Sequence, residues 1–215
     1  EHTITEVVTG IDIVQAQILI AEGADLHKDV KIPEQDKIPL LGSAIQCRIT
    51  TEDPENNFLP DTGKIDTYRS PGGFGVRLDV GNAYSGYEVT PYFDSLLVKV
   101  ITNATDFKEA IRKMDRCLRE FRIRGVKTNI PFLRNVLNHP EFISGDAKTT
   151  FIDSTPELFD LPRLRDRGNK TMKYIANITV NGFPGINQTS KPYFDETRYP
   201  KVKKIETLTT KNILD

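Results

Sequence analysis

Hydrophobic and polar residues alternate along several short stretches of the chain, and this pattern predicts β-strands. In residues 44–49, Ile45, Cys47 and Ile49 alternate with small or polar residues. A period of two is typical of a strand that buries one face and exposes the other. The same alternation predicts strands at residues 63–69, 74–80 and 174–180, and a pair of strands at residues 87–92 and 95–102.

Apolar residues recur every three or four positions elsewhere, which predicts amphipathic helices. The clearest helix covers residues 105–123, with Thr105 or Asp106 as its cap and an apolar face that runs along its length. Shorter helices are predicted at residues 11–22 and 131–137. We expect Asn129 to cap the last of these, because asparagine is favoured immediately before a helix.

Length and composition limit the classes of protein to consider. A chain of 215 residues suits one domain, or one domain with a smaller appendage, and strands followed by packed helices predict an α+β fold. The 29 basic and 30 acidic residues nearly balance, so charge favours neither nucleic acid nor an anionic membrane as a partner. No apolar run approaches the ~20 residues of a membrane span. Cys47 and Cys117 are expected to be buried free thiols of a reducing compartment.

Arg48 is the first candidate for chemistry, because the predicted strand holds it at a fixed position facing away from the apolar side. A guanidinium placed in this way offers a planar fork of donors to a carboxylate, to carbonate or to a developing oxyanion. The pattern alone favours an arginine that lies in solvent or pairs with a nearby acid.

A series of motifs resembles the biotin-dependent carboxylase family of ATP-grasp enzymes. The motifs occur in the order and at the approximate spacing of that family, and together they resemble the C-terminal part of a biotin carboxylase domain over residues 1–153. Several motifs in register are far more specific than any single one. They are EHTITEVVTG (1–10), QCRI (46–49), EDP (52–54), FLP (58–60), GKI (63–65), PGGFGVR (71–77), YFDS (92–95) and GVKTN (125–129).

The resemblance implies roles for three polar residues. Glu1 would be the general base that takes the proton from bicarbonate, so that the carbonate attacks the γ-phosphate of ATP. Arg48 would hold bicarbonate and then stabilise the negative ureido oxygen of biotin. Asp94 would organise the side chains beside the carboxylation site. On local pattern, Glu1 is also simply a charged chain terminus, and Asp94 suits the cap of a turn equally well.

The resemblance also implies contacts outside the reaction centre. Phe74 and Arg77, on opposite faces of the strand 74–80, would lie at a homodimer contact, and Thr149 would lie near the base of ATP. The implied cofactors are biotin, ATP and Mg²⁺. In the family, the nucleotide-binding lysines and the metal-binding carboxylates precede the position of Glu1, so we expect no metal ligands in this chain.

Residues beyond 153 narrow the family. Residues 154–182 resemble the start of the allosteric (tetramerisation) region of pyruvate carboxylases, and residues 183–215 resemble the linker toward the carboxyltransferase domain. Arg163, Arg165 and Arg167 are three arginines in five residues, which invites a phosphorylated ligand. The family binds acetyl-CoA in this region, and the alternative is a solvated basic linker.

Two functional hypotheses of different classes follow. The first is a piece of a ligase of the pyruvate carboxylase family, which uses ATP and bicarbonate to carboxylate biotin and then converts pyruvate into oxaloacetate. Within this class, the biotin carboxylase portion of another acyl-CoA carboxylase is the alternative. The second hypothesis is a non-catalytic dimerisation scaffold of α+β type.

The first hypothesis implies partners and a compartment. The partners are bicarbonate, pyruvate, a biotinyl carrier domain and, as an effector, acetyl-CoA, in a homo-oligomer that we expect to be a tetramer. The compartment is the cytoplasm, or the mitochondrial matrix in a eukaryote. The chain begins inside a motif and without methionine, so we expect a fragment that is inactive alone.

Overall fold

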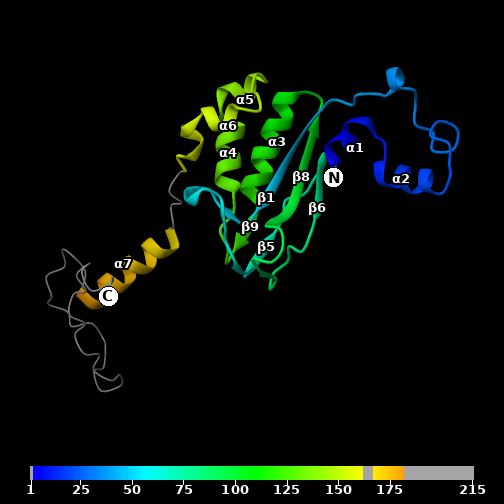
Figure 1. Cartoon of the computed structure of the whole chain (residues 1–215). Coiled ribbons are helices and arrows are strands. Elements are labelled where there is room, and N and C mark those ends of the chain that lie inside the picture. The colour runs from blue at the N-terminus through cyan, green and yellow to red at the C-terminus, as the bar shows by residue number, and fades with distance from the viewer. Residues whose placement is uncertain (1, 162–166, 182–215) are drawn as a thin grey trace. The chain divides into compact units, whose positions relative to one another are not determined.

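The computed structural model describes residues 2–161 and 167–181 of the chain (Figure 1). They belong to two units, residues 1–163 and residues 164–215, which are described separately. In its described residues, the first unit contains a three-stranded antiparallel sheet, short two-stranded ribbons and packed helices. This mixture confirms the predicted α+β class.

Two helices come first along the chain, a run of strands follows, and the remaining elements are mostly helices. The helices are α1 (Thr3–Thr9), α2 (Ile13–Ala21), α3 (Phe107–Glu120), α4 (Ile130–Asn138), α5 (Pro140–Ser144), α6 (Phe151–Ser154) and α7 (Arg167–Asn181), with 3-10 turns η1 (Gln35–Lys37), η2 (Pro54–Asn56) and η3 (Pro156–Phe159). The strands are β1 (Ser43–Thr50), β2 (Glu52–Asp53), β3 (Leu59–Pro60), β4 (Gly63–Lys64), β5 (Thr67–Arg69), β6 (Val76–Val80), β7 (Glu88–Val89), β8 (Leu96–Ala104) and β9 (Arg122–Arg124).

The three-stranded sheet has β8 at its centre, with β1 on one side and β6 on the other. Helix α3 packs against β8 and β1 and covers one face of this sheet (Figure 1). Under the helix, Ile49, Val98 and Val100 are fully buried together with Met114 of α3. The strand predicted at residues 44–49 is confirmed as β1, and its apolar face is the side that meets α3.

The helix predicted at residues 105–123 is confirmed as α3, but it ends at Glu120. Asp106 caps it as expected, because its side chain accepts a hydrogen bond from the backbone amide of Glu109 at 2.8 Å. Phe121 leaves the helix with φ −56° and ψ 137°. Its ring stays buried and packs edge-on against Tyr68, so the next residues continue as strand β9 rather than as helix.

The strand predicted at residues 63–69 is divided, because the chain changes its pairing partner in the middle. β4 pairs with β7, whereas β5 pairs with β9. The exchange takes place at the buried residue Ile65, whose amide donates to the carbonyl of Tyr87, while the amide of Asp66 donates to the carbonyl of Arg124.

The predicted pairing of residues 87–92 with residues 95–102 is wrong. β7 covers only Glu88–Val89 and pairs with β4, and β8 pairs with β1 and β6 instead. Pro91 follows β7 and has no amide hydrogen to donate to a neighbouring strand, which ends the ladder there.

The helices after α3 form a second, smaller apolar cluster. The helix predicted at residues 131–137 is confirmed as α4. Phe132 of α4 packs with Phe151 and Leu158, and the ring of Phe58 meets Phe132 edge-on at 5.0 Å between centroids. This cluster holds α6 and η3 against α4.

The helix predicted at residues 11–22 is present as α2, and Asp12 caps it by accepting from the amide of Gln15 at 2.8 Å. Its expected apolar face is largely exposed among the described residues, since Val14 and Ile18 are 57% and 56% exposed. Among the described residues no single helix is long and apolar enough to cross a membrane. α1 and α2 meet that length and composition test only as a pair bent by 98°.

The strand predicted at residues 174–180 is wrong, because these residues belong to helix α7. The segment also has apolar residues spaced three or four positions apart, and such residues are neighbours on a helix. Ile178 follows Tyr174 by four positions and Ile175 by three, so the same segment is compatible with a helix.

Candidate functional site

The face of the sheet opposite α3 carries polar side chains. On β1 this face holds Gln46 and Arg48, as the alternation predicted. The register of the strands places Arg48 beside Lys99 of β8, which in turn lies beside Asp79 of β6. The adjacent row holds Gln46 and Arg77. One sheet surface therefore brings together charged residues from three strands.

Arg48 has a fixed backbone and an exposed side chain. Its neighbours Cys47 and Ile49 are 6% and 0% exposed in the core. A register slip by one residue would expose both of them, so the strand keeps Arg48 on the opposite face. The Arg48 side chain is exposed, and its guanidinium has no hydrogen bond or ion pair with any residue that the structure describes. Its planar fork of donors is therefore open to an anion.

Helix α1 is fastened to this polar face by two side-chain contacts. The hydroxyl of Thr3, a residue only 4% exposed, donates to Oε1 of Gln46 at 2.6 Å. Glu6 accepts from Nη1 of Arg77 at 2.6 Å. Glu1 itself lies outside the described residues, but the helix that begins two positions after it is tied to the strand of Arg48.

Arg77 is the centre of a three-residue ion-pair network. Besides its contact with Glu6, its Nε and Nη2 donate to the two carboxylate oxygens of Asp79 at 2.8 and 3.0 Å. The hydrogen bonds to Asp79 and then to Glu6 raise the pKa of Arg77. All of these contacts lie within the chain, so Arg77 links α1 to β6.

Phe74, the other predicted interface residue, precedes β6 instead of lying on it. Its side chain is 96% exposed, and Nζ of Lys113 lies 5.7 Å from the centre of its ring. The expectation that Phe74 and Arg77 occupy opposite faces of one strand is therefore wrong. Their part in a dimer contact stays a prediction.

Asp94 lies at the rim of a cavity of about 310 Å³ next to the end of β1. Its side chain is exposed and makes no hydrogen bond to Arg48 or to another described residue. The adjoining Glu52 is well bonded, because its carboxylate accepts from the hydroxyls of Thr50 at 2.9 Å and Ser95 at 2.8 Å. The structure thus brings Asp94 to the end of the strand of Arg48 without a direct contact between them.

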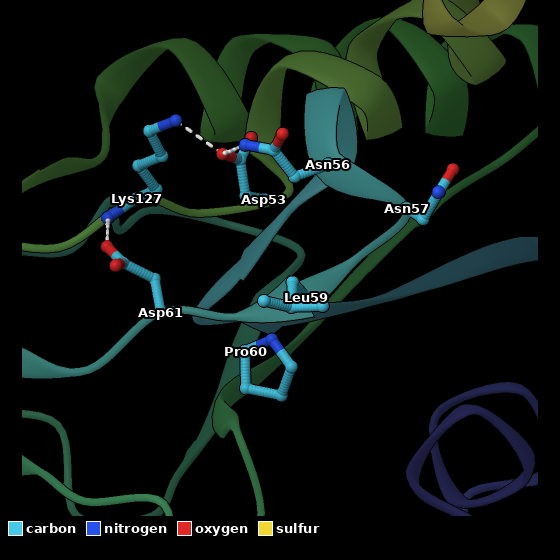
Figure 2. A pocket seen from close by; sticks show the side chains of 7 residues that line it. All are labelled: Asp53, Asn56, Asn57, Leu59, Pro60, Asp61 and Lys127. Carbon is cyan, nitrogen blue, oxygen red and sulfur yellow. Dashed lines mark hydrogen bonds and ion pairs between the residues drawn. The ribbon is translucent and has the colours of Figure 1, made fainter.

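A second cavity, of about 520 Å³, lies beside the turn that follows β1 (Figure 2). Lys127 forms an ion pair with Asp53, and its backbone amide donates to Asp61 at 2.6 Å. Asn56 donates to Asp53 at 2.5 Å. The hydrogen bond from Lys127 is the largest cause of a lowered pKa for Asp53. These charged groups satisfy one another, so they fasten two segments rather than present free groups to a ligand.

Among the remaining predicted site residues, Thr149 is the one whose side chain the structure describes. Thr149 is exposed in the turn before α6. Arg163 and Arg165 lie outside the described residues, and Arg167 is the first residue of α7, where its side chain is not described. Their predicted ligands therefore stay predictions.

The two cysteines are buried free thiols, as expected. Burial, with a smaller contribution from Cys117, raises the pKa of Cys47 to about 12. A thiol is a poor nucleophile and a poor metal ligand unless it is deprotonated, so Cys47 is a core residue. Within residues 2–161 and 167–181, no group of three or more His, Cys, Asp or Glu side chains could hold a metal ion.

Two features of the structure were missed in the sequence. Asn129 bonds to the strand of Arg48, and no local pattern indicates a contact across some 80 residues. The ribbon of β5 and β9 carries Arg69, Arg122 and Arg124 on one exposed face, opposite Tyr68. The Arg-Ile-Arg spacing at residues 122–124 could have indicated this cationic face, had the segment been read as a strand.

Comparison with known proteins places these features in a family. Residues 46–154 match the biotin carboxylase C-terminal domain. The chain is 61% identical to pyruvate carboxylase of Bacillus subtilis over 203 residues, which cover 94% of this chain and 18% of that protein. It is 58% identical to pyruvate carboxylase of Staphylococcus aureus over 219 residues, which cover 100% of this chain and 19% of that protein. The chain thus spans less than a fifth of the length of these curated relatives.

Solved structures give the same grouping. A Rhizobium etli pyruvate carboxylase variant with its allosteric activator, acetyl coenzyme A, superposes with a TM-score of 0.79 at 56% identity, covering 86% of this chain and 18% of that one. The biotin carboxylase domain dimer of Hydrogenobacter thermophilus 2-oxoglutarate carboxylase, in complex with MgADP, ADP and bicarbonate, superposes with a TM-score of 0.70 at 40% identity. It covers 76% of this chain and 35% of that one.

Proposed function

Because this chain belongs to the biotin carboxylase C-terminal domain family, we propose that it forms part of a ligase that carboxylates biotin with ATP and bicarbonate and passes the carboxyl group to pyruvate. The product would be oxaloacetate. Identity of 58 to 61% with two pyruvate carboxylases supports this acceptor over that of another biotin-dependent carboxylase. No residue of the described site distinguishes pyruvate from another acceptor, because we assign the transfer of the carboxyl group from biotin to the carboxyltransferase domain.

The observation that carries the proposal is the open guanidinium of Arg48 on the polar sheet face. A fixed arginine without an internal carboxylate partner suits the binding of bicarbonate, because its fork matches two anionic oxygens. The same donors would stabilise negative charge on an oxygen as it develops, in the manner of an oxyanion site. Biotin, when bound, supplies the group that accepts and carries the carboxyl.

We assign to Glu1 the role of the general base that takes the proton from bicarbonate. The support is positional: α1 begins two residues after Glu1 and is held to the strand of Arg48 by Thr3 and Gln46. A base must lie within hydrogen-bond reach of the proton that it takes. Asp94 lies near the end of the strand of Arg48, and we assign to it the role of orienting the side chains beside the carboxylation site.

ATP and Mg²⁺ are assigned mainly to parts of the enzyme other than the described residues. No three acidic, His or Cys side chains in the described ranges come together as metal ligands, so these residues do not fit Mg²⁺. Thr149 is kept as a candidate contact to the nucleotide, since it is exposed. No catalytic step is assigned to a described residue through Mg²⁺.

The assembly belongs to the same proposal. We assign the intact enzyme as a homo-oligomer, a tetramer, with Phe74 and Arg77 at a two-fold contact and a biotinyl carrier domain as internal partner. Acetyl-CoA is assigned as the effector at Arg163, Arg165 and Arg167; one similar structure was solved with this activator. The buried free thiols suit a cytoplasmic enzyme, or one of the mitochondrial matrix in a eukaryote.

The decisive experiment replaces Arg48 in the intact carboxylase. Arg48→Gln keeps a polar side chain but removes the charge and the fork, and we expect biotin carboxylation to fall by about 10²- to 10³-fold. The affinity for ATP, measured by calorimetry, should stay near that of the parent. Arg112→Gln, which changes an exposed arginine paired with Glu109 on α3, is the matched control and should leave the rate unchanged. Parental biotin turnover in the Arg48 variant would refute the assignment.

A further inference from the structure

Strand β1, which carries Arg48, lies at an edge of the sheet. β8 pairs with one side of it, and no described strand pairs with the other. The register of the β1–β8 pair shifts between Ile49 and Thr50, so the ladder becomes irregular one residue beyond Arg48. Backbone groups on the free side of an edge strand have no fixed partners unless another segment provides them.

Asn129 provides those partners at the end of β1. Its Nδ2 donates to the carbonyl of Arg48 at 3.0 Å, and its Oδ1 accepts from the amide of Thr50 at 3.0 Å. Its own backbone amide donates to the carbonyl of Thr50 at 3.2 Å. A side-chain amide has the same donor and acceptor as a peptide bond, so one residue acts here as a short length of neighbouring strand.

The side chain of Asn129 serves the strand rather than its own helix. Asn129 precedes α4 at the cap position, yet its side chain makes no capping hydrogen bond. An asparagine in that position ordinarily bonds to a backbone amide of the first turn. The residue is 7% exposed, so water does not compete for these bonds. The expected cap is thus absent because both amide groups bond to β1.

We propose that Asn129 is a positioning residue for Arg48, and this inference rests on the proposed function of Arg48. The hydrogen bonds to the Arg48 carbonyl and from the Thr50 amide hold the backbone on both sides of Ile49, where the ladder becomes irregular. With that backbone held, the guanidinium leaves the strand from a constant position. A displacement of about 1 Å at a reacting centre lowers rates by as much as roughly 10²-fold. Asn129 touches no substrate in this scheme and acts only through Arg48.

A double-mutant cycle in the intact carboxylase tests the proposal. Asn129→Ala should lower kcat for biotin carboxylation by roughly 10- to 10²-fold, with the KM for ATP unchanged. In the Arg48→Gln background the same substitution should cause no further loss, because the residue through which it acts is already absent. Asn129→Ser, which keeps one short hydrogen-bonding group, takes the place of the alanine variant if the latter does not fold.

Asn135→Ala is the matched control. Asn135 lies on the same helix, is half-buried, and also donates two hydrogen bonds to backbone carbonyls, those of Leu158 at 2.9 Å and Asp160 at 3.1 Å. It should lower thermal stability but leave kcat near the parental value.

Three results would overturn the inference, and they separate it from the proposed function. If Asn129→Ala lowers kcat equally in both backgrounds, its effect is a general loss of structure and the positioning role is wrong. If Asn129→Ala keeps the parental kcat, the role is also wrong, while that of Arg48 stands. If Arg48→Gln alone keeps the parental rate, the proposed function of Arg48 fails and the positioning role fails with it.

Discussion

Arg48 and Asp53 are five residues apart in sequence, yet their side chains have opposite environments. Arg48 is exposed and has no partner among the described residues. Asp53 is 6% exposed and bonds to Lys127, Asn56 and the amide of Glu55. A buried charge is stable only when it is paired and hydrogen-bonded, whereas an exposed charge is solvated and can remain unpaired at little cost in free energy. For this reason we assign a role in ligand binding to Arg48 and a structural role to Asp53.

Glu1 gives a prediction at the same scale. Glu1→Gln in the intact carboxylase keeps the size and hydrogen-bonding shape but removes the base, so bicarbonate-dependent ATP cleavage should fall by roughly 10²- to 10⁴-fold. Binding of ATP should survive, as measured by calorimetry. Glu22→Gln, at the exposed end of α2, serves as the control. Cleavage at the parental rate in the Glu1 variant would mean that another group takes the proton.

At the scale of elements, the polar sheet face depends on fastenings between segments far apart in the chain. Thr3 and Glu6 tie α1 to β1 and β6, and Lys127 ties the segment before α4 to the turn after β1. Asn129 completes this second fastening. Each contact joins segments that lie far apart in the sequence.

The ion pair of Asp53 predicts a pH dependence of stability. Its folded-state pKa lies below its ordinary value, chiefly because Lys127 donates to it. The stabilisation is therefore complete above the unfolded pKa of about 3.9 and is lost as the pH falls through the folded pKa. Asp53→Asn should lower the free energy of unfolding of the chain by about 1 to 2 kcal/mol at pH 7, since a buried acceptor and a cap are weakened.

The difference between the Asp53→Asn variant and its parent should shrink as the pH is lowered toward 3, because the unfolded parent then takes up a proton that the folded carboxylate resists. Thermal unfolding at the two pH values measures this. Asp146→Asn, at an exposed turn after α5, should show no such convergence. A difference that stays constant between pH 7 and pH 3 would show that the Asp53 carboxylate is not held in its charged form by the fold.

At the scale of the whole molecule, Phe74 is the most exposed of the large hydrophobic side chains in the described part of the first unit. Phe74 is 96% exposed in the turn before β6, whereas Arg77 is engaged with Glu6 and Asp79 inside the chain. A test of the dimer contact at Arg77 would disturb that internal network as well. Phe74 is therefore the better residue for probing assembly.

We expect Phe74→Asp in the intact carboxylase to weaken self-association, raising the dimer dissociation constant by about tenfold or more, the usual loss for a central aromatic contact. Sedimentation over a range of concentrations measures the shift. Tyr84→Asp changes another exposed aromatic residue, 59% exposed before β7, and should leave the assembly unchanged. A variant that remains fully dimeric at low concentration would remove Phe74 from the interface.

The sequence by itself determined the elements whose pattern is strong and local. The alternation of Ile45, Cys47 and Ile49 decided the faces of β1 and the outward direction of Arg48, because successive side chains of a strand point to opposite sides. The apolar face of residues 105–123 decided α3 and the side that it buries. The resemblance to the biotin carboxylase family followed from several ordered motifs, which no single segment could have indicated.

Only the tertiary structure decided which segments pair and which side chains hold them. β4 and β5 separate because Ile65 and Asp66 bond to different partners, and β8 joins β1 across some 50 residues. The side chain of Asn129 bonds to β1 and not to its own helix. Helix α7 replaced a predicted strand because its alternation also satisfied a helical face. Periodicity records the conformation of neighbouring residues, whereas hydrogen-bond partners distant in sequence exist only once the chain has folded.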